Sequence, residues 1–206
     1  MGDPRVPPRK RSVIRARDLE KRYGRKPALR AVSFEVARGG FLVVTGPNGS
    51  GKTTLLRLVV GLAAPTRGTL EVDADRADVG YLGHEPLVYG ELTAIENLDL
   101  YGRLYRVSER RERIGMLLER FGLWEARNER LTAYSRGMVQ RLALCRAFLH
   151  NPRLLVLDEP FTALDDAGAA QLERELAMLA AERTLVVSTH DPGRVARLAT
   201  AQMALA

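Results

Sequence analysis

A glycine-rich segment near the end of the first quarter of the chain constrains the fold more than any other feature. Residues 46–53 read GPNGSGKT and fit the pattern G-x-x-x-x-G-K-[ST]. The apolar run 41–45 precedes this segment, and an apolar stretch with helical spacing begins near Lys52. The order strand, loop, helix predicts a phosphate-binding loop at the end of a buried strand. A simple glycine-rich turn is the alternative interpretation.

The residue types in this loop suit a triphosphate. Glycines at 46, 49 and 51 let successive backbone amides point toward phosphate, and the helix N-terminus adds partial positive charge. Lys52 is expected to reach the β- and γ-phosphates, and the Thr53 hydroxyl to bind Mg²⁺. The candidate nucleotide-binding residues of the loop are Gly46, Pro47, Asn48, Gly49, Ser50, Gly51, Lys52, Thr53 and Thr54.

Two further apolar runs end in polar residues that suit catalysis. Residues 154–157 lead into Asp158 and Glu159, and residues 185–187 come shortly before His190. Such runs are typical of a mostly parallel sheet with its site at the carboxyl ends of the strands. Asp158 is expected to hold Mg²⁺, Glu159 to act as general base on the attacking water, and His190 to contact the γ-phosphate. A solvated strand end and a structural histidine are the alternatives.

The rest of the chain divides by composition and periodicity. Residues 1–11 contain three prolines and four basic residues, which predicts a disordered basic tail before one domain at 12–206. Between residues 92 and 150 the apolar residues fall at helical spacing, which predicts an inserted helical subdomain. Thr93 and Glu96 have capping-box spacing, so a helix should begin there.

Composition and charge exclude several classes of protein. Apolar residues make up 46% of the chain, as in a globular domain, and no apolar run approaches the ~20 residues that span a bilayer. The net charge of +7 comes from dispersed arginines without interleaved aromatic residues. Solvated faces explain this charge better than an anionic membrane surface or nucleic acid, and we expect no nucleic-acid partner. The single Cys145 cannot form an internal disulfide, which favours a cytosolic location.

Taken together and in order, the motifs resemble those of the ATP-binding cassette family, the nucleotide-binding subunits of ABC transporters. The resemblance extends from about Val13 over almost the whole chain. Besides the residues above it rests on Tyr23 in the adenine-stacking position, LTAIENL at 92–98, YSRGM at 134–138 and TALD at 162–165. It implies an α/β fold: a P-loop NTPase of the ABC type with a mostly parallel core sheet, an antiparallel β subdomain and an inserted α-helical subdomain.

The resemblance also implies activity and partners. The family's cassettes hydrolyse ATP with Mg²⁺ and drive integral membrane subunits from the cytoplasmic face of the membrane, where they are peripheral. Two copies bind head to tail, and the signature of each copy contacts the ATP held by the other. Here the signature residues are Ser135, Arg136, Gly137 and Met138, and Asp165 occupies the D-loop position that connects the two sites. A homodimer formed on ATP binding is therefore expected.

Two departures from the family pattern affect the expected turnover. The signature usually reads LSGGQ, whereas Arg136 and Met138 here replace a glycine and the glutamine. His84 aligns with the Q-loop glutamine that contacts Mg²⁺ and the attacking water, so it is a candidate for both catalysis and metal contact. Imidazole can bond through one nitrogen, but its charge titrates near pH 6.5. We expect weakened or more tightly gated hydrolysis.

Finer resemblance concerns the cargo. Gly83 with His84, the YSRGM signature and EPFTALD at 159–165 are most similar to the ATPase subunit of the haem exporter of cytochrome c maturation. Exporters of lipids, drugs or polysaccharides share parts of this pattern. A soluble ABC protein acting on ribosomes or DNA, and a regulatory nucleotide-binding module, are alternatives from other classes. The apolar residues Leu87, Val88 and Tyr89 either receive the membrane partner or belong to the core.

Overall fold

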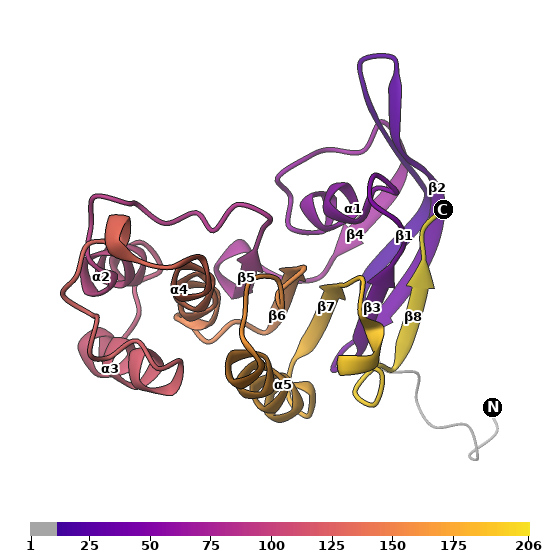
Figure 1. Ribbon diagram of the computed structural model, residues 1–206. Coiled ribbons are helices and arrows are strands. Elements are labelled where there is room, and N and C mark those ends of the chain that lie inside the picture. The colour runs from indigo at the N-terminus through magenta and orange to yellow at the C-terminus, as the bar shows by residue number, and fades with distance from the viewer. Residues whose placement is uncertain (1–11) are drawn as a thin grey trace.

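The computed structural model describes residues 12–206, and the tail predicted for residues 1–11 lies outside them. Its centre is a five-stranded sheet with the order β5-β6-β7-β3-β8, in which every neighbouring pair is parallel (Figure 1). The strands are β3 (Phe41–Thr45), β5 (Val79–Leu82), β6 (Leu154–Asp158), β7 (Thr184–Ser188) and β8 (Ala201–Ala204). Parallel neighbours bring the carboxyl ends of β3, β6 and β7 to one edge of the sheet.

Side chains that alternate along the strands contribute to two hydrophobic cores, one on each face of the sheet. Phe41 and Val43 of β3 face a cluster built with α5 (Asp166–Ala180) and the helical region, whereas Leu42 and Val44 face a cluster built with α1 (Lys52–Val59). Successive side chains of a strand point to opposite faces, so one short apolar run serves both cores. Helices α1 and α5 accordingly lie on opposite faces of the parallel sheet (Figure 1).

A separate antiparallel sheet covers the outer side of the hydrophobic cluster that contains α1. It has the order β2-β1-β4 and consists of β1 (Ser12–Tyr23), β2 (Lys26–Ala37) and β4 (Arg67–Val72). Within the antiparallel β subdomain that the resemblance implied, β1 and β2 form one long hairpin whose tip projects from the molecule (Figure 1). Several register shifts interrupt the pairing, one of them next to Asp18 with φ 45°, and these bends explain why the alternation in the sequence is broken.

Three helices lie at the other side of the molecule from this hairpin: α2 (Ala94–Leu104), α3 (Arg110–Arg120) and α4 (Arg136–Phe148) (Figure 1). The predicted capping box at the start of α2 is present, because the Thr93 hydroxyl accepts from the Glu96 amide at 3.2 Å and the Glu96 carboxylate accepts from the Thr93 amide at 2.8 Å. All three helices fall within residues 92–150. Short 3₁₀ turns at Arg76–Asp78, Leu131–Ala133 and Pro192–Arg194 complete the elements.

Helix α4 connects this helical region to the sheet. Its C-terminal half is buried in the core shared with β5 and β6, and it ends at Phe148, three residues before Asn151, which has φ 54°. Pro152 follows, and it has no backbone amide to continue the helical hydrogen bonds. Within residues 12–206 no helix has both the length and the apolar character that a bilayer crossing requires.

Candidate functional site

The glycine-rich loop joins β3 to α1 as the sequence predicts. Gly51 caps α1 with φ 99°, and a Cβ atom there would collide with the backbone carbonyl of Ala28. Gly46 has φ 147°, and a Cβ atom on it would lie 2.5 Å from the carbonyl oxygen of Leu205. The loop therefore needs glycine at both positions, for backbone conformation and for space.

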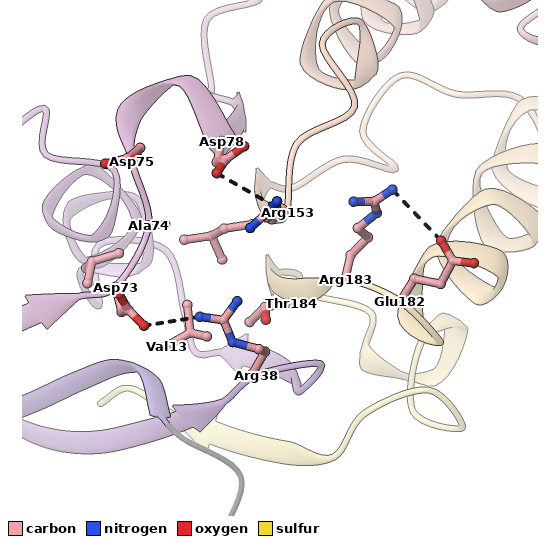
Figure 2. A pocket seen from close by; sticks show the side chains of 12 residues that line it. Val13, Arg38, Asp73, Ala74, Asp75, Asp78, Arg153, Glu182, Arg183 and Thr184 are labelled. Carbon is pink, nitrogen blue, oxygen red and sulfur yellow. Dashed lines mark hydrogen bonds and ion pairs between the residues drawn. The ribbon is translucent and has the colours of Figure 1, made fainter.

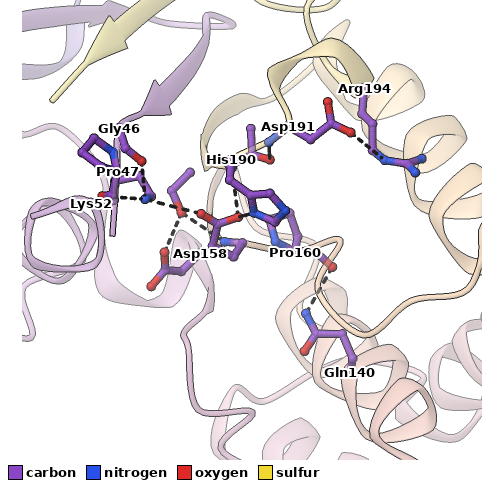
Figure 3. A network of polar contacts seen from close by, with 12 residues as sticks. Gly46, Pro47, Lys52, Gln140, Asp158, Pro160, His190, Asp191 and Arg194 are labelled. Atoms are coloured by element: carbon purple, nitrogen blue, oxygen red, sulfur yellow. Dashed lines mark hydrogen bonds and ion pairs between the residues drawn. The ribbon is translucent and has the colours of Figure 1, made fainter. Parts of the chain in front are cut away.

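Lys52 lies buried inside the curve of this loop. Its ammonium donates to the carbonyls of Gly46 at 2.8 Å and Pro47 at 3.3 Å, and lies 3.6 Å from Oε1 of Glu159 (Figure 3). The first turn of α1 contains no acidic residue to offset its positive end. A fixed ammonium beside a helix N-terminus is an electrostatic environment that favours phosphate.

The ends of β6 and β7 hold the acidic residues in place. Asp158 and Ser188 are paired across the two strands, and the Ser188 hydroxyl donates to Oδ1 of Asp158 at 2.5 Å. Oε2 of Glu159 accepts from the His190 backbone amide at 3.2 Å and lies 2.8 Å from Nδ1 of the same histidine. Because an ionised carboxylate only accepts, Nδ1 carries the proton in this arrangement. Figure 3 shows Lys52, Asp158 and His190 converging on one region.

The structure offers a fit for Mg²⁺ at Asp158. Asp158 is 2% exposed, and its Oδ2 is buried without a hydrogen-bond partner. A buried carboxylate oxygen without a donor is costly and suits a hard cation. No group of three or more His, Cys, Asp or Glu side chains within residues 12–206 could hold a metal. Mg²⁺ is commonly bound through one or two carboxylates together with substrate phosphates. Asp158 and the Thr53 hydroxyl are the residues that would hold it.

A cavity of about 530 Å³ unites most of the predicted site residues. The β1–β2 hairpin contributes Tyr23, whose ring is half exposed and has the Lys21 ammonium 5.0 Å from its centroid. The other predicted residues in the lining are Asn48, Gly49, Gly51, Lys52, Thr53, Thr54, His84, Glu159 and His190. Sequence reasoning missed Lys26, Pro27, Ala28 and Thr162. Lys26 pairs with Tyr23 across the hairpin turn, so recognising the hairpin would have found it.

The signature residues and Asp165 do not line this cavity. Ser135 caps α4 by accepting from the Met138 amide at 3.2 Å, and Asp165 caps α5 by accepting from the Gly168 amide at 2.9 Å. Arg136 is exposed, while Met138 packs partly against the core. One copy of the chain therefore does not bring these predicted nucleotide contacts to its own phosphate loop.

The segment after β5 separates into exposed and packed residues. Leu87 is 45% exposed and Tyr89 is 53% exposed, whereas Val88 packs against the core. The Tyr101 hydroxyl donates to the Leu87 carbonyl at 2.6 Å, which holds the segment against α2. Leu87 and Tyr101 line a separate cavity of about 430 Å³ with Leu62. Val88 therefore belongs to the core, whereas binding of a membrane partner at Leu87 and Tyr89 stays a prediction.

Another cavity, of about 520 Å³, lies at the opposite ends of the strands, beside the first residues of β6 and β7 (Figure 2). Six of its seven charged side chains pair with one another: Arg38 with Asp73 at 3.1 Å, and Arg153 with Asp78 and Arg183 with Glu182 at 3.9 Å each. Because these charges largely compensate and the cavity lies away from the strand ends that carry Asp158 and His190, it is not the nucleotide site.

Comparison with known proteins identifies the family. A family model described as ABC transporter matches residues 29–162. The chain belongs to the ABC transporter family. It is 41% identical over 184 residues to the uncharacterised ABC transporter ATP-binding protein YxlF of Bacillus subtilis, covering 86% of this chain and 62% of YxlF. It is 40% identical over 189 residues to the daunorubicin resistance ATP-binding protein DrrA3 of Streptomyces coeruleorubidus, covering 86% and 60%. The chain thus spans about three fifths of the length of these relatives.

A solved ABC cassette has the same fold. The dimeric structure of a post-hydrolysis state of the cassette MJ0796, bound to ADP and Pi, superposes with a TM-score of 0.84 at 29% identity. The match covers 93% of this chain and 94% of the cassette. The predicted fold class is confirmed: the chain is an ABC-type ATPase domain with a parallel core sheet, an antiparallel sheet and helices.

Proposed function

We propose that this chain is the ATP-hydrolysing subunit that energises an ABC exporter. The observation that carries the proposal is the single cavity in which the phosphate loop, the Glu159–His190 pair and the exposed ring of Tyr23 meet. Tyr23 would stack on adenine, the loop amides and Lys52 would hold the phosphates, and Glu159 would face the γ-phosphate end. Mg²⁺, when bound by Asp158 and Thr53, would neutralise charge on the β- and γ-phosphates.

Glu159 is placed to act as the general base. One carboxylate oxygen is fixed by both donors of His190, and the other lies 3.6 Å from the Lys52 ammonium. Contacts on both oxygens orient the carboxylate, so that it accepts the proton of a water attacking the γ-phosphate. His190, whose side chain is 70% exposed and lines the cavity, positions this base and would contact the transferred phosphate.

A second copy of the chain would complete the site. Ser135 and Gly137 lie at the N-terminus of α4, outside the cavity of their own copy, where the helix end favours an anion. A two-fold arrangement would place them on the nucleotide of the partner, with Asp165 near the junction. The likeness to a cassette that forms a dimer with ADP and Pi supports this proposal. Arg136 would add a guanidinium there, and Met138 would lack the polar contact of glutamine.

The membrane partner would bind at the segment after β5. Leu62, Leu87 and Tyr89 expose large apolar side chains, and His84, three residues before Leu87, lines the nucleotide cavity. A contact made at Leu87 could therefore reach the γ-phosphate end through His84, only three residues away. This arrangement supports peripheral attachment to integral membrane subunits at the cytoplasmic face, with hydrolysis gated by the partner.

Two cargo classes are proposed on different grounds. Haem export or handling in cytochrome c maturation follows from the sequence resemblance in the Q-loop, signature and residues 159–165. Drug export is proposed from the 40% identity to the daunorubicin resistance protein. The daunorubicin resistance relative thus supports a drug-like cargo, whereas the motif pattern supports haem.

Isolation from native membranes tests these proposals. The protein is purified with and without ATP in mild detergent, and its companions are identified by mass spectrometry and by the haem absorbance spectrum. Multi-span proteins without a cassette support the transporter subunit. Bound haem then selects cytochrome maturation, and its absence together with a drug-sensitive deletion strain selects drug export. Ribosomal proteins or DNA-repair factors in place of membrane proteins would overturn the transporter assignment.

A further inference from the structure

We infer that Ser188 is a positioning residue that fixes the carboxylate of Asp158 for Mg²⁺ and the backbone of Glu159 for catalysis. The inference rests on the proposed ATPase function, since it assigns roles to Asp158 and Glu159. Ser188 is the last residue of β7, is fully buried, and lies outside the motifs that identify the family. Its hydroxyl does not line the nucleotide cavity, so any effect on the reaction passes through these neighbours.

The first contact sets the orientation of Asp158. Ser188 and Asp158 face each other in the parallel pairing of β6 and β7, and the hydroxyl donates to Oδ1 at 2.5 Å. In the described part of the chain this hydroxyl is the one hydrogen-bond donor to the Asp158 carboxylate. Its hydrogen bond occupies Oδ1 and leaves Oδ2, buried and without a partner, as the oxygen available to a cation.

The second contact holds Glu159 in an unusual backbone conformation. Glu159 has φ 47°, a region that residues other than glycine rarely adopt. Its amide donates both to the Ser188 hydroxyl at 3.0 Å and to the Ser188 carbonyl at 3.1 Å. Strained backbone persists only where its surroundings hold it, and here two oxygens of one residue do so. The bend turns the Glu159 side chain toward Lys52 and His190.

Ser188, the last residue of β7, and His190 therefore position different groups of Asp158 and Glu159. His190 binds the Glu159 carboxylate, and Ser188, two residues earlier, binds the Asp158 carboxylate and the Glu159 amide. A serine hydroxyl meets both demands because it donates one hydrogen bond and accepts others at the same oxygen. Alanine at this position would remove the donor to Oδ1 and one of the two acceptors of the Glu159 amide, with little change in volume.

Metal binding measured without turnover tests the role. Mn²⁺ serves as the probe for Mg²⁺, and its affinity for the full chain with a non-hydrolysable ATP analogue is followed by electron paramagnetic resonance. Ser188→Ala is expected to weaken Mn²⁺ affinity about 10-fold, the lower end of the effect of losing a partner that orients a metal ligand. Binding of the analogue in EDTA should stay at the wild-type level, because Lys52 and the loop are untouched.

A matched control separates positioning from general loss of stability. Thr184→Val removes a hydroxyl from the other end of β7, where Thr184 accepts from the Gly39 amide at 3.0 Å and is also buried. It should lower the unfolding midpoint as Ser188→Ala does but leave Mn²⁺ affinity unchanged. Should the alanine variant fail to fold, Ser188→Cys keeps a side chain of similar size with a weaker donor and should show the same selective loss.

The results distinguish a failure of the role proposed for Ser188 from a failure of the proposed ATPase function. Wild-type Mn²⁺ affinity in Ser188→Ala, or an equal loss in Thr184→Val, would overturn the role of Ser188 while leaving the ATPase proposal in place. A wild-type chain that binds Mn²⁺ with the analogue but does not hydrolyse ATP would overturn the ATPase proposal and leave the metal-positioning role intact. A selective loss of metal affinity in Ser188→Ala establishes the role of Ser188 in positioning Asp158.

Discussion

Replacement of Glu159 by glutamine isolates the charge of the proposed base from its geometry. In the structure Oε2 of Glu159 receives two donors from His190, and the amide oxygen of glutamine can accept the same two hydrogen bonds. The substitution therefore preserves shape and orientation and removes the group that accepts a proton. It also removes a negative charge from the phosphate end of the cavity, so ATP binding should be as tight as in the wild type or tighter.

The expected loss follows from the role of a general base. Positioned acid–base groups contribute about 10² to 10⁴ in rate, which corresponds to about 2.7 to 5.4 kcal/mol in the activation free energy. The upper part of this range applies here, because Glu159 is the one carboxylate among residues 12–206 that lines the cavity. Steady-state phosphate release at saturating ATP measures the rate, equilibrium binding of a fluorescent ATP analogue measures affinity, and gel filtration with ATP measures dimer formation.

Glu182→Gln is the matched control. Glu182 is largely exposed and lines the cavity at the opposite ends of the strands, so the same chemical change there should leave the rate unaltered. A Glu159→Gln protein that retains more than about a tenth of the wild-type rate would refute the assignment of Glu159 as the base. In cells, a regulatory nucleotide-binding module should keep its biological activity with this substitution, whereas a transport motor should arrest in the ATP-bound dimer.

Three further substitutions test other parts of the structure. Gly51→Ala should abolish ATP binding measured by calorimetry, because φ 99° and the Ala28 carbonyl of β2 leave no room for a methyl group. Normal affinity would show that the loop adapts. Arg120→Met should lower the free energy of unfolding in urea by about 2 kcal/mol. This loss is smaller than that for breaking a fully buried ion pair, because Arg120 is 36% exposed beside the buried Glu175. The same substitution at the exposed Arg111 should change the stability little. Burial lowers the pKa of His150, so the folded state prefers neutral imidazole: the stability this provides is present above about pH 6.5 and is lost as the pH falls through the folded pKa. His150→Phe should flatten this dependence in thermal unfolding between about pH 5 and 6.5, and an unchanged slope would assign it to another group.

Local signals account for what could be predicted. The phosphate loop, the buried strands beside it and the capping box of α2 depend on residues close in sequence, so their patterns are legible without the fold. The hairpin β1–β2 was harder to predict from the sequence. Its register shifts break the alternation of apolar and polar residues, and its turn lacks the usual Asn-Gly or Asp-Gly pair. Val88 and Leu87 have similar character, and which of them is buried depends on how their segment packs against α2.

The sequence by itself determined the chemistry available to this protein: a triphosphate-binding loop, two adjacent carboxylates after a buried strand, and a histidine after another. Tertiary structure decided which of these groups act together. Glu159 and His190 are 31 residues apart and Asp158 and Ser188 are 30 apart, and only the parallel pairing of β6 and β7 brings each pair into hydrogen-bond contact. The same folding leaves the signature at α4 outside its own nucleotide cavity. Such contacts depend on strand order and register. Residues that are distant in sequence determine both, because they bury a common core together.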